Sequence, residues 1–122
     1  MVTTPDETNG EFAALYRLVR QAGLLQRRKT WYGWKIAGTF AALAAGWVLF
    51  ALAGDSWWQL AVAVFLAAAF AQVGFIGHDA GHRQVFATRR SNYLLGMLCG
   101  NLAIGMSYGW WVTKHNRHHA RP

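Results

Sequence analysis

The sequence predicts an all-α membrane protein: a transmembrane helical hairpin, then an interfacial or re-entrant helix, with cytoplasmic helices that carry histidines. Hydrophobic residues make up 54% of the 122 residues and charged residues only 14%, whereas charged residues make up about 25% of a typical soluble domain. Long segments contain no charge, and all five histidines fall in two clusters that border these segments.

The beginning of the chain predicts a tail and a surface helix. Residues 1–11 are polar and predict a disordered tail. Residues 12–30 predict an amphipathic helix, because Phe12 and Leu15 begin a series of apolar residues at helical spacing, with arginines such as Arg17 between them. A basic amphipathic helix suits an anionic membrane surface, but a solvated helix or a loose tail explains the pattern equally well.

Within residues 31–122, two segments predict a hairpin that crosses the membrane twice. Residues 36–54 and 56–77 contain no charged side chain. At a rise of ~1.5 Å per residue, each segment can cross a hydrocarbon core of about 30 Å. Only Asp55 separates the two segments, and the neighbouring Trp57 is typical of a membrane interface.

The basic residues predict the orientation of this hairpin. Six of the twelve Lys and Arg residues lie at or before Lys35, and six lie at or after Arg83. The positive-inside rule therefore places both termini and both histidine clusters on the cytoplasmic side of the cell membrane. These charges flank apolar segments instead of forming one basic face, which argues against nucleic-acid binding.

Residues 93–112 form a third uncharged segment, for which we predict an interfacial or re-entrant helix instead of a crossing. The segment contains several glycines, as well as Asn101 and Ser107. A crossing would put the second histidine cluster on the opposite side of the membrane from the first, so the two could not share a metal. Irregular backbone is tolerated at membrane depth where protein covers it.

The two histidine clusters predict a metal site. His78 and His82 are four residues apart, so on a helix they project from nearly the same face. His118 and His119 lie on either side of the direction of His115 by the same arithmetic. Neutral imidazole is the commonest protein ligand for metals, and an all-histidine set favours iron, zinc or copper over magnesium or calcium.

Two polar residues beside these histidines each have two possible roles. Asp79 could accept a hydrogen bond from a ligand histidine and orient its ring, or it could pair with Arg83, four residues later. Asn116 lies between candidate ligands, where its amide could support them or could be an ordinary surface group.

The two clusters resemble the histidine motifs of the integral-membrane fatty acid desaturases. Residues 78–82, HDAGH, match the H-x3-H motif of that family, and residues 115–119, HNRHH, match its H-x2-HH motif. The flanking residues 72–77 and 110–114 are also similar, particularly to the front-end, acyl-lipid branch. The resemblance covers residues 30–122.

This resemblance implies a helical membrane stem with a cytoplasmic part that holds two iron ions. All five histidines would then be iron ligands, and the reaction would insert a double bond into a fatty acyl chain with O₂. The electrons would come from a separate donor, such as a ferredoxin or a cytochrome b5-like protein.

The family also has a third histidine motif and typically two further membrane helices downstream, and this sequence contains neither. We therefore expect the chain to be the N-terminal part of a longer desaturase, with an incomplete set of iron ligands and no activity alone. A truncated gene, an interrupted reading frame and a split subunit all account for such a chain.

Other functions fit the same residues. A lipid or carotenoid hydroxylase is the nearest of them, because related families use similar histidine motifs to form an alcohol instead of an alkene. A small non-catalytic metal-binding membrane hairpin would bind zinc without oxygen chemistry, and a purely structural hairpin would bind no metal.

Overall fold

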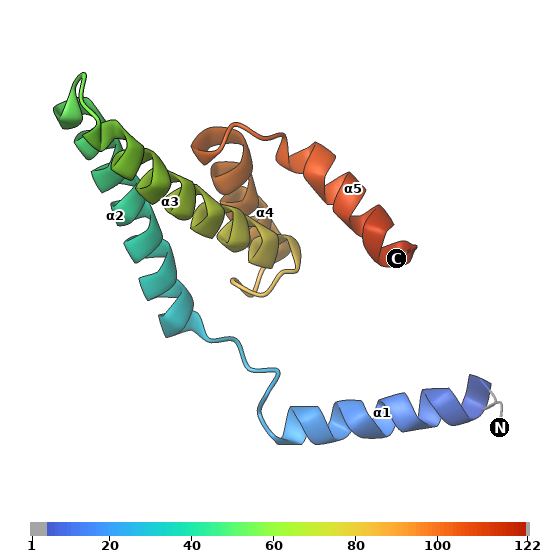
Figure 1. Ribbon diagram of the computed structural model, residues 1–122. Coiled ribbons are helices and arrows are strands. Elements are labelled where there is room, and N and C mark those ends of the chain that lie inside the picture. The colour runs from blue at the N-terminus through green and yellow to red at the C-terminus, as the bar shows by residue number, and fades with distance from the viewer. Residues whose placement is uncertain (1–4, 122) are drawn as a thin grey trace.

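The computed structural model describes residues 5–121, and this range contains helices and no strand, which confirms the prediction of an all-α protein. Figure 1 shows α2 and α3 as a long hairpin, with α4 and α5 beside the C-terminal half of α3. The elements are α1 (Pro5–Gln21), α2 (Lys29–Ala53), α3 (Trp58–Gly81), α4 (Arg89–Met97), the π-helix η1 (Leu98–Ala103) and α5 (Tyr108–Ala120).

α2 and α3 form the hairpin, and both are long and apolar enough to cross a membrane. The turn between them depends on Gly54, whose φ of 57° lies in the left-handed region that glycine adopts without steric cost. The Gln59 amide closes the turn by donating hydrogen bonds to the carbonyl oxygens of Phe50 and Gly54, both at 3.0 Å. α3 continues past the apolar segment to Gly81, and its last turn carries His78.

α1 differs from the sequence prediction at both ends. The prediction gives a disordered tail over residues 1–11 and a helix over 12–30, whereas the helix covers Pro5–Gln21; residues 1–4 lie outside the described range. A proline is favourable in the first turn of a helix, where its missing N–H is not needed. Gly23, with a φ of 71°, follows the last turn, as a glycine commonly does at a helix C-terminus.

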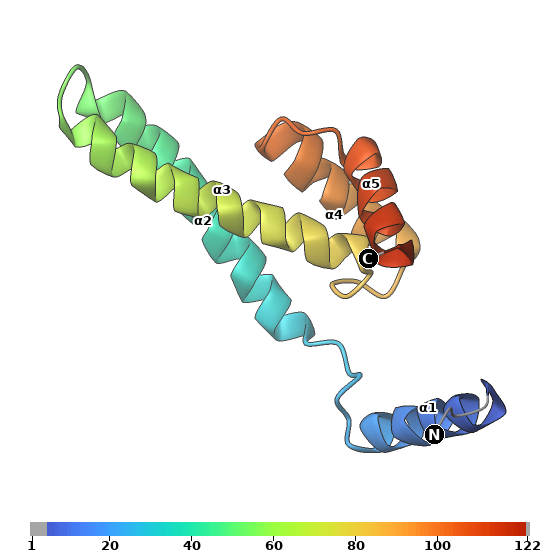
Figure 2. The ribbon, with the colours of Figure 1, turned by 45° about the vertical axis from the view of Figure 1, so that its right-hand side comes forward.

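Figures 1 and 2 show α1 apart from the other helices. Its apolar side chains are uncovered: Phe12 is 70% exposed and Leu18 is 63% exposed. An exposed apolar face next to Arg17 and Arg20 keeps the features of a membrane-surface helix, and that location stays a prediction.

The sequence predicted one interfacial or re-entrant helix over residues 93–112. In the structure this segment is instead a reversal of the chain. α4 passes into η1, the chain turns at Gly105, and α5 runs back towards the end of α3. Gly105 has a φ of 69°, and Asn101 holds the turn because its Oδ1 accepts a hydrogen bond from the Tyr108 N–H at 2.8 Å. The glycine and polar residues of this segment therefore build a turn. Its position relative to a bilayer stays a prediction.

The core extends along the interface of α2 and α3, and its most deeply buried part lies between α3, α4 and the loop that joins them, residues 82–88. Ile76 of α3 is completely buried, and Asn92 of α4 is 1% exposed. The Asn92 amide donates to the carbonyl oxygens of Phe86 and Thr88, both at 2.7 Å, and its Oδ1 accepts from the Phe86 N–H at 3.0 Å. Because this buried amide is fully paired, it fixes the loop without a desolvation penalty.

Tyr108 attaches α5 to α3 and α4. Its side chain is 3% exposed, and it packs where neighbouring helices have no side chain. A Cβ added at Gly96 in α4 would overlap the Tyr108 ring, and one added at Gly81 in α3 would lie 2.8 Å from the ring of Trp111. α5 thus packs directly against the backbone of two helices, a close approach that glycine allows.

We predict that Gly96→Ala destabilises the fold, because the added methyl group displaces Tyr108. Overpacking of this kind costs about 1–3 kcal/mol, so the thermal midpoint in detergent micelles should fall, as measured by circular dichroism. Gly109→Ala is the matched control, since a Cβ at this position on α5 meets no atom within 4 Å. Equal midpoints for the two variants would contradict the role of this contact.

Candidate metal centre

Four of the five histidines converge where the end of α3 meets α5. His78 lies in the last turn of α3 and His82 follows it, while His115 and His119 lie four residues apart on α5. The ligand nitrogens of His78, His82 and His115 all lie within 4.8 Å of one another. The Nε2 atoms of His82 and His115 are 2.9 Å apart, and those of His115 and His119 are 3.0 Å apart. The structure therefore brings residues of both motifs together.

The two shorter separations, between His82 and His115 and between His115 and His119, suit one shared metal ion. Two nitrogens bound to an ion at right angles, with bonds of about 2.1 Å, would lie ~3.0 Å apart. Without an ion, the His115 Nε2 has either one proton or one lone pair, yet it contacts both His82 and His119. A metal that takes one lone pair from each ring satisfies all of these nitrogens, and an all-nitrogen set suits iron, zinc or copper.

Two of the predicted site residues lie outside this convergence. His118 is exposed, and its ring centroid lies 5.7 Å from that of His119, so its role as a ligand stays a prediction. Residues four apart on a helix share a face more closely than residues three apart, which puts His119 and not His118 beside His115. Asn116 is exposed and lines a separate cavity that contains none of the histidines.

Asp79 connects the histidines to α2. Its Oδ1 lies 3.5 Å from the His78 Nδ1, a distance at the limit of a hydrogen bond. Its Oδ2 accepts a hydrogen bond from the Tyr32 hydroxyl at 3.1 Å and lies 3.5 Å from the Lys35 Nζ. The alternative, an ion pair with Arg83, is not formed, because α3 ends at Gly81 and the spacing of a continuous helix no longer applies.

The site has an aromatic wall that the sequence analysis did not identify. Trp111 stacks on His115 with ring centroids 4.4 Å apart and an angle of 15° between the ring planes, and its centroid lies 5.8 Å from that of His78. Tyr108 stacks in turn on Trp111. The available signal was the spacing of four residues between Trp111 and His115, which places them on one helix face.

Crowding favours the neutral imidazoles. Loss of contact with water, and then the proximity of His78 and His119, lowers the pKa of His82 below its usual 6.5, although the residue as a whole is exposed. Burial and the neighbouring imidazoles also lower the pKa of His115. Neutral imidazole is the form that binds metal. Because the folded chain holds fewer protons on these rings than the unfolded chain, their contribution to stability falls as the pH drops below 6.5.

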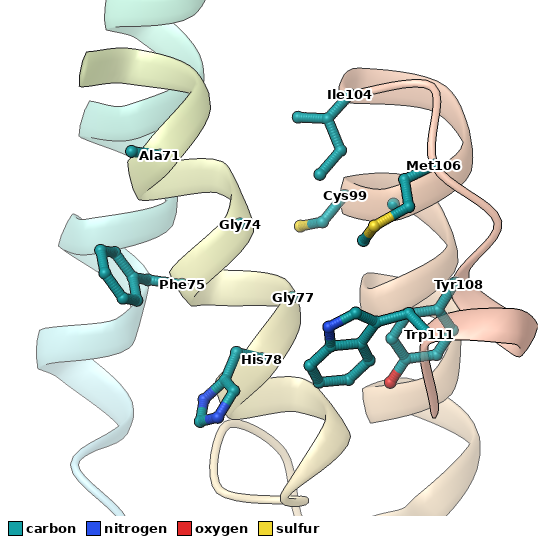
Figure 3. Close-up of a pocket in the computed structure, with 11 residues that line it drawn as sticks. Ala71, Gly74, Phe75, Gly77, His78, Cys99, Ile104, Met106, Tyr108 and Trp111 are labelled. Carbon is teal, nitrogen blue, oxygen red and sulfur yellow. The ribbon is translucent and has the colours of Figure 1, made fainter. Parts of the chain in front are cut away.

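An apolar cavity of about 320 Å³ opens beside His78. Figure 3 shows it between α3 and the returning segment, with Trp111 and Tyr108 opposite His78. Gly74 and Cys99 line it farther along α3 and η1, and its surface is almost entirely apolar. The histidine cluster thus adjoins both the exposed surface and an apolar cavity.

The comparison with known families agrees with this site. The sequence profile described as fatty acid desaturase matches residues 55–122, which include both histidine motifs. The chain belongs to the fatty acid desaturase family. Together with the two apolar helices, this membership makes it a membrane-associated member of an oxidoreductase family, and iron is the metal typical of that family.

Several curated desaturases are similar to the chain along most of its length. An acyl-lipid (9-3)-desaturase of Physcomitrium patens is 36% identical over 112 residues, which is 92% of this chain and 21% of that protein. A Delta(6)-fatty-acid desaturase of Caenorhabditis elegans is 31% identical over 89% of this chain and 24% of its own length. A Delta(8)-fatty-acid desaturase of Euglena gracilis is 30% identical over 94% of this chain and 27% of its own length. The chain thus spans about a quarter of each relative, and no solved structure matches it.

We predict that His115→Ala and His118→Ala affect the first bound metal ion differently. His115 lies at the centre of the cluster, so its loss should weaken Co²⁺ binding by roughly 100-fold or more, beyond the effect of losing a supporting residue. His118→Ala, on the same helix, should change the affinity little because His118 lies outside the cluster. Titration of the visible Co²⁺ absorption measures both, and equal losses would show that the observed convergence is not the binding site.

Proposed function

We propose that this chain supplies the membrane hairpin and part of the di-iron site of a desaturase, which introduces a double bond into a fatty acyl chain with O₂. One observation carries the proposal: His78, His82, His115 and His119 converge beside an apolar cavity in a chain of the fatty acid desaturase family. An acyl chain in this cavity would have its carbon atoms next to the candidate metal ligands.

Each part of the site has a distinct task in this proposal. His78, His82, His115 and His119 would hold iron through their ring nitrogens, and Asp79 would orient the His78 ring. Trp111 covers the flat face of His115 and excludes water from it. The irons, when bound, supply the oxidising power by which O₂ removes two hydrogens from the acyl chain, while the protein supplies ligation and positioning.

The apolar cavity beside His78 is the proposed place of the acyl chain. Its surface is almost entirely apolar, and Ala71, Gly74 and Phe75 of α3 line it on the side of the apolar hairpin. Burial of each methylene group contributes about 0.8 kcal/mol. A chain in this cavity has carbon atoms next to the metal ligands without any covalent attachment to the protein.

The ligand set supports a further part of the proposal, that activity requires residues beyond these. Two iron ions have more coordination positions than five histidines can fill, and His118 stands apart from the others. We propose that the chain alone does not desaturate. Electrons come from a separate donor, such as a ferredoxin or a cytochrome b5-like protein, on the cytoplasmic side to which the basic residues assign both termini.

We predict that the chain restores a desaturase when it replaces the matching segment of the Physcomitrium patens relative. Yeast expressing this chimera should gain new double bonds in its fatty acids, measured by gas chromatography and mass spectrometry, because the chimera has a complete ligand set. The His115→Ala chimera should form none, since the central ligand is absent.

Three outcomes of this experiment would contradict the proposal. Hydroxylated fatty acids in place of alkenes would assign the site to a hydroxylase. Unchanged product from the His115→Ala chimera would exclude the histidine cluster from the reaction. Double bonds formed by the 122-residue chain alone would show that it needs no further ligands.

We predict that Gly74→Leu in this chimera lowers the yield of double bonds, most of all in the longest acyl chains. Gly74 lines the cavity, and a Cβ at this position meets no atom within 4 Å, so a larger side chain has room to begin there and to take up space in the cavity. Iron content should not change. Gly38→Leu is the control, because Gly38 is equally open and lies on α2 away from the cavity. The same product profile for both variants would place the acyl chain elsewhere.

A further inference from the structure

A second cavity, of about 160 Å³, lies where the end of α3 meets α4 and α5. Arg83, Arg89 and Asn116 line it, and so does Tyr108. The Tyr108 ring also lines the apolar cavity beside His78. One buried aromatic ring therefore stands between an apolar cavity and a basic one.

The charge of the second cavity is not compensated within its own lining, which contains two arginines and no carboxylate. The nearby Asp79 is already held by Lys35 at 3.5 Å and by Tyr32 at 3.1 Å. A concave surface with one sign of charge focuses the field and attracts ions of the opposite sign. The cavity therefore favours an anionic ligand.

Arg83 lies at the start of the loop that joins α3 to α4, and Arg89 is the first residue of α4. Arg83 has a φ of 57°, the left-handed conformation that a chain commonly adopts just after the end of a helix. The contacts that hold this conformation are the hydrogen bonds from the Arg83 N–H to the Ala80 carbonyl and from the Gln84 N–H to the Asp79 carbonyl, both at 3.0 Å. The far end of the loop is held by the buried Asn92.

We propose that this cavity binds the phosphate group of the molecule that carries the acyl chain, an inference that rests on the proposed function. Guanidinium groups make paired, charge-assisted hydrogen bonds to phosphate oxygens, and the Asn116 amide adds an uncharged donor. A ligand at this position has its anionic group between Arg83 and Arg89, and the Tyr108 ring lies between this group and the apolar cavity beside His78. A phospholipid and an acyl-coenzyme A thioester both have this chemistry.

The test uses the metal-free chain in uncharged detergent micelles, with binding measured by isothermal titration calorimetry. The ligands are palmitoyl-coenzyme A, palmitoyl-lysophosphatidylglycerol, palmitate and uncharged monopalmitoylglycerol. Arg89→Gln and Arg83→Gln should each weaken the binding of at least one of the two phosphate-bearing ligands roughly tenfold, which corresponds to the loss of about one charge-assisted pair. Neither substitution should change the affinity for monopalmitoylglycerol. The ligand that shows this dependence identifies the carrier.

Arg90→Gln is the matched control, because Arg90 is exposed on the same turn of α4 as Arg89 but does not line the cavity. It should reduce the affinity far less than Arg89→Gln does. Inorganic phosphate at high concentration should compete with the phosphate-bearing ligand in the unmodified chain and not in the Arg89→Gln variant.

Each other outcome would overturn the proposal. Equal losses of affinity for the phosphate-bearing ligand in Arg89→Gln and Arg90→Gln would mean that the ligand is attracted by the basic surface in general. A parallel loss of affinity for monopalmitoylglycerol would mean that the substitution disturbs the structure. The same dependence on Arg89 for palmitate would assign the cavity to a carboxylate. Because binding is measured without iron, these failures leave the proposed desaturation intact, and failure of the chimera to form double bonds would not change the calorimetric result.

Discussion

The direct packing of α5 on the glycine backbone of α3 and α4 is the constraint on which the rest of this structure depends. Tyr108 fills the space that a side chain at Gly96 would occupy, and Trp111 lies equally close to Gly81. These contacts fix both the position of α5 and its rotation about its own axis. Because Trp111 and His115 are stacked on the same helix face, that rotation also aims the second histidine motif at the first.

The resulting site joins three helices that have different tasks. α3 and α5 provide the imidazoles, while α2 holds Asp79 through Tyr32 and Lys35 and so ties the site to the hairpin. The aromatic wall then divides the surroundings of the cluster into an apolar cavity and a basic one. This division matches the two ends of a lipid-like molecule, which is the physical basis of both proposals made above.

The helical hairpin was predictable because it depends on local properties of the chain. A single segment that crosses a bilayer in contact with lipid is helical, since lipid offers no partner for backbone polar groups. The reversal of the chain within residues 93–112 was harder to predict from the sequence. Its glycines and Asn101 argued against a simple crossing, but only the pairing of the Asn101 oxygen with the Tyr108 N–H shows that they form a turn between two helices.

The sequence by itself determined which histidines are candidates for the site, because histidine spacing on a helix follows from helix geometry alone. It could not decide between His118 and His119, since both lie within about 60° of His115 on the helix. It could not decide the partner of Asp79 either. Those choices depend on how α5 is rotated and on α2 lying beside α3. Tertiary packing decided them, because contacts between residues distant in the chain have no signature in local spacing.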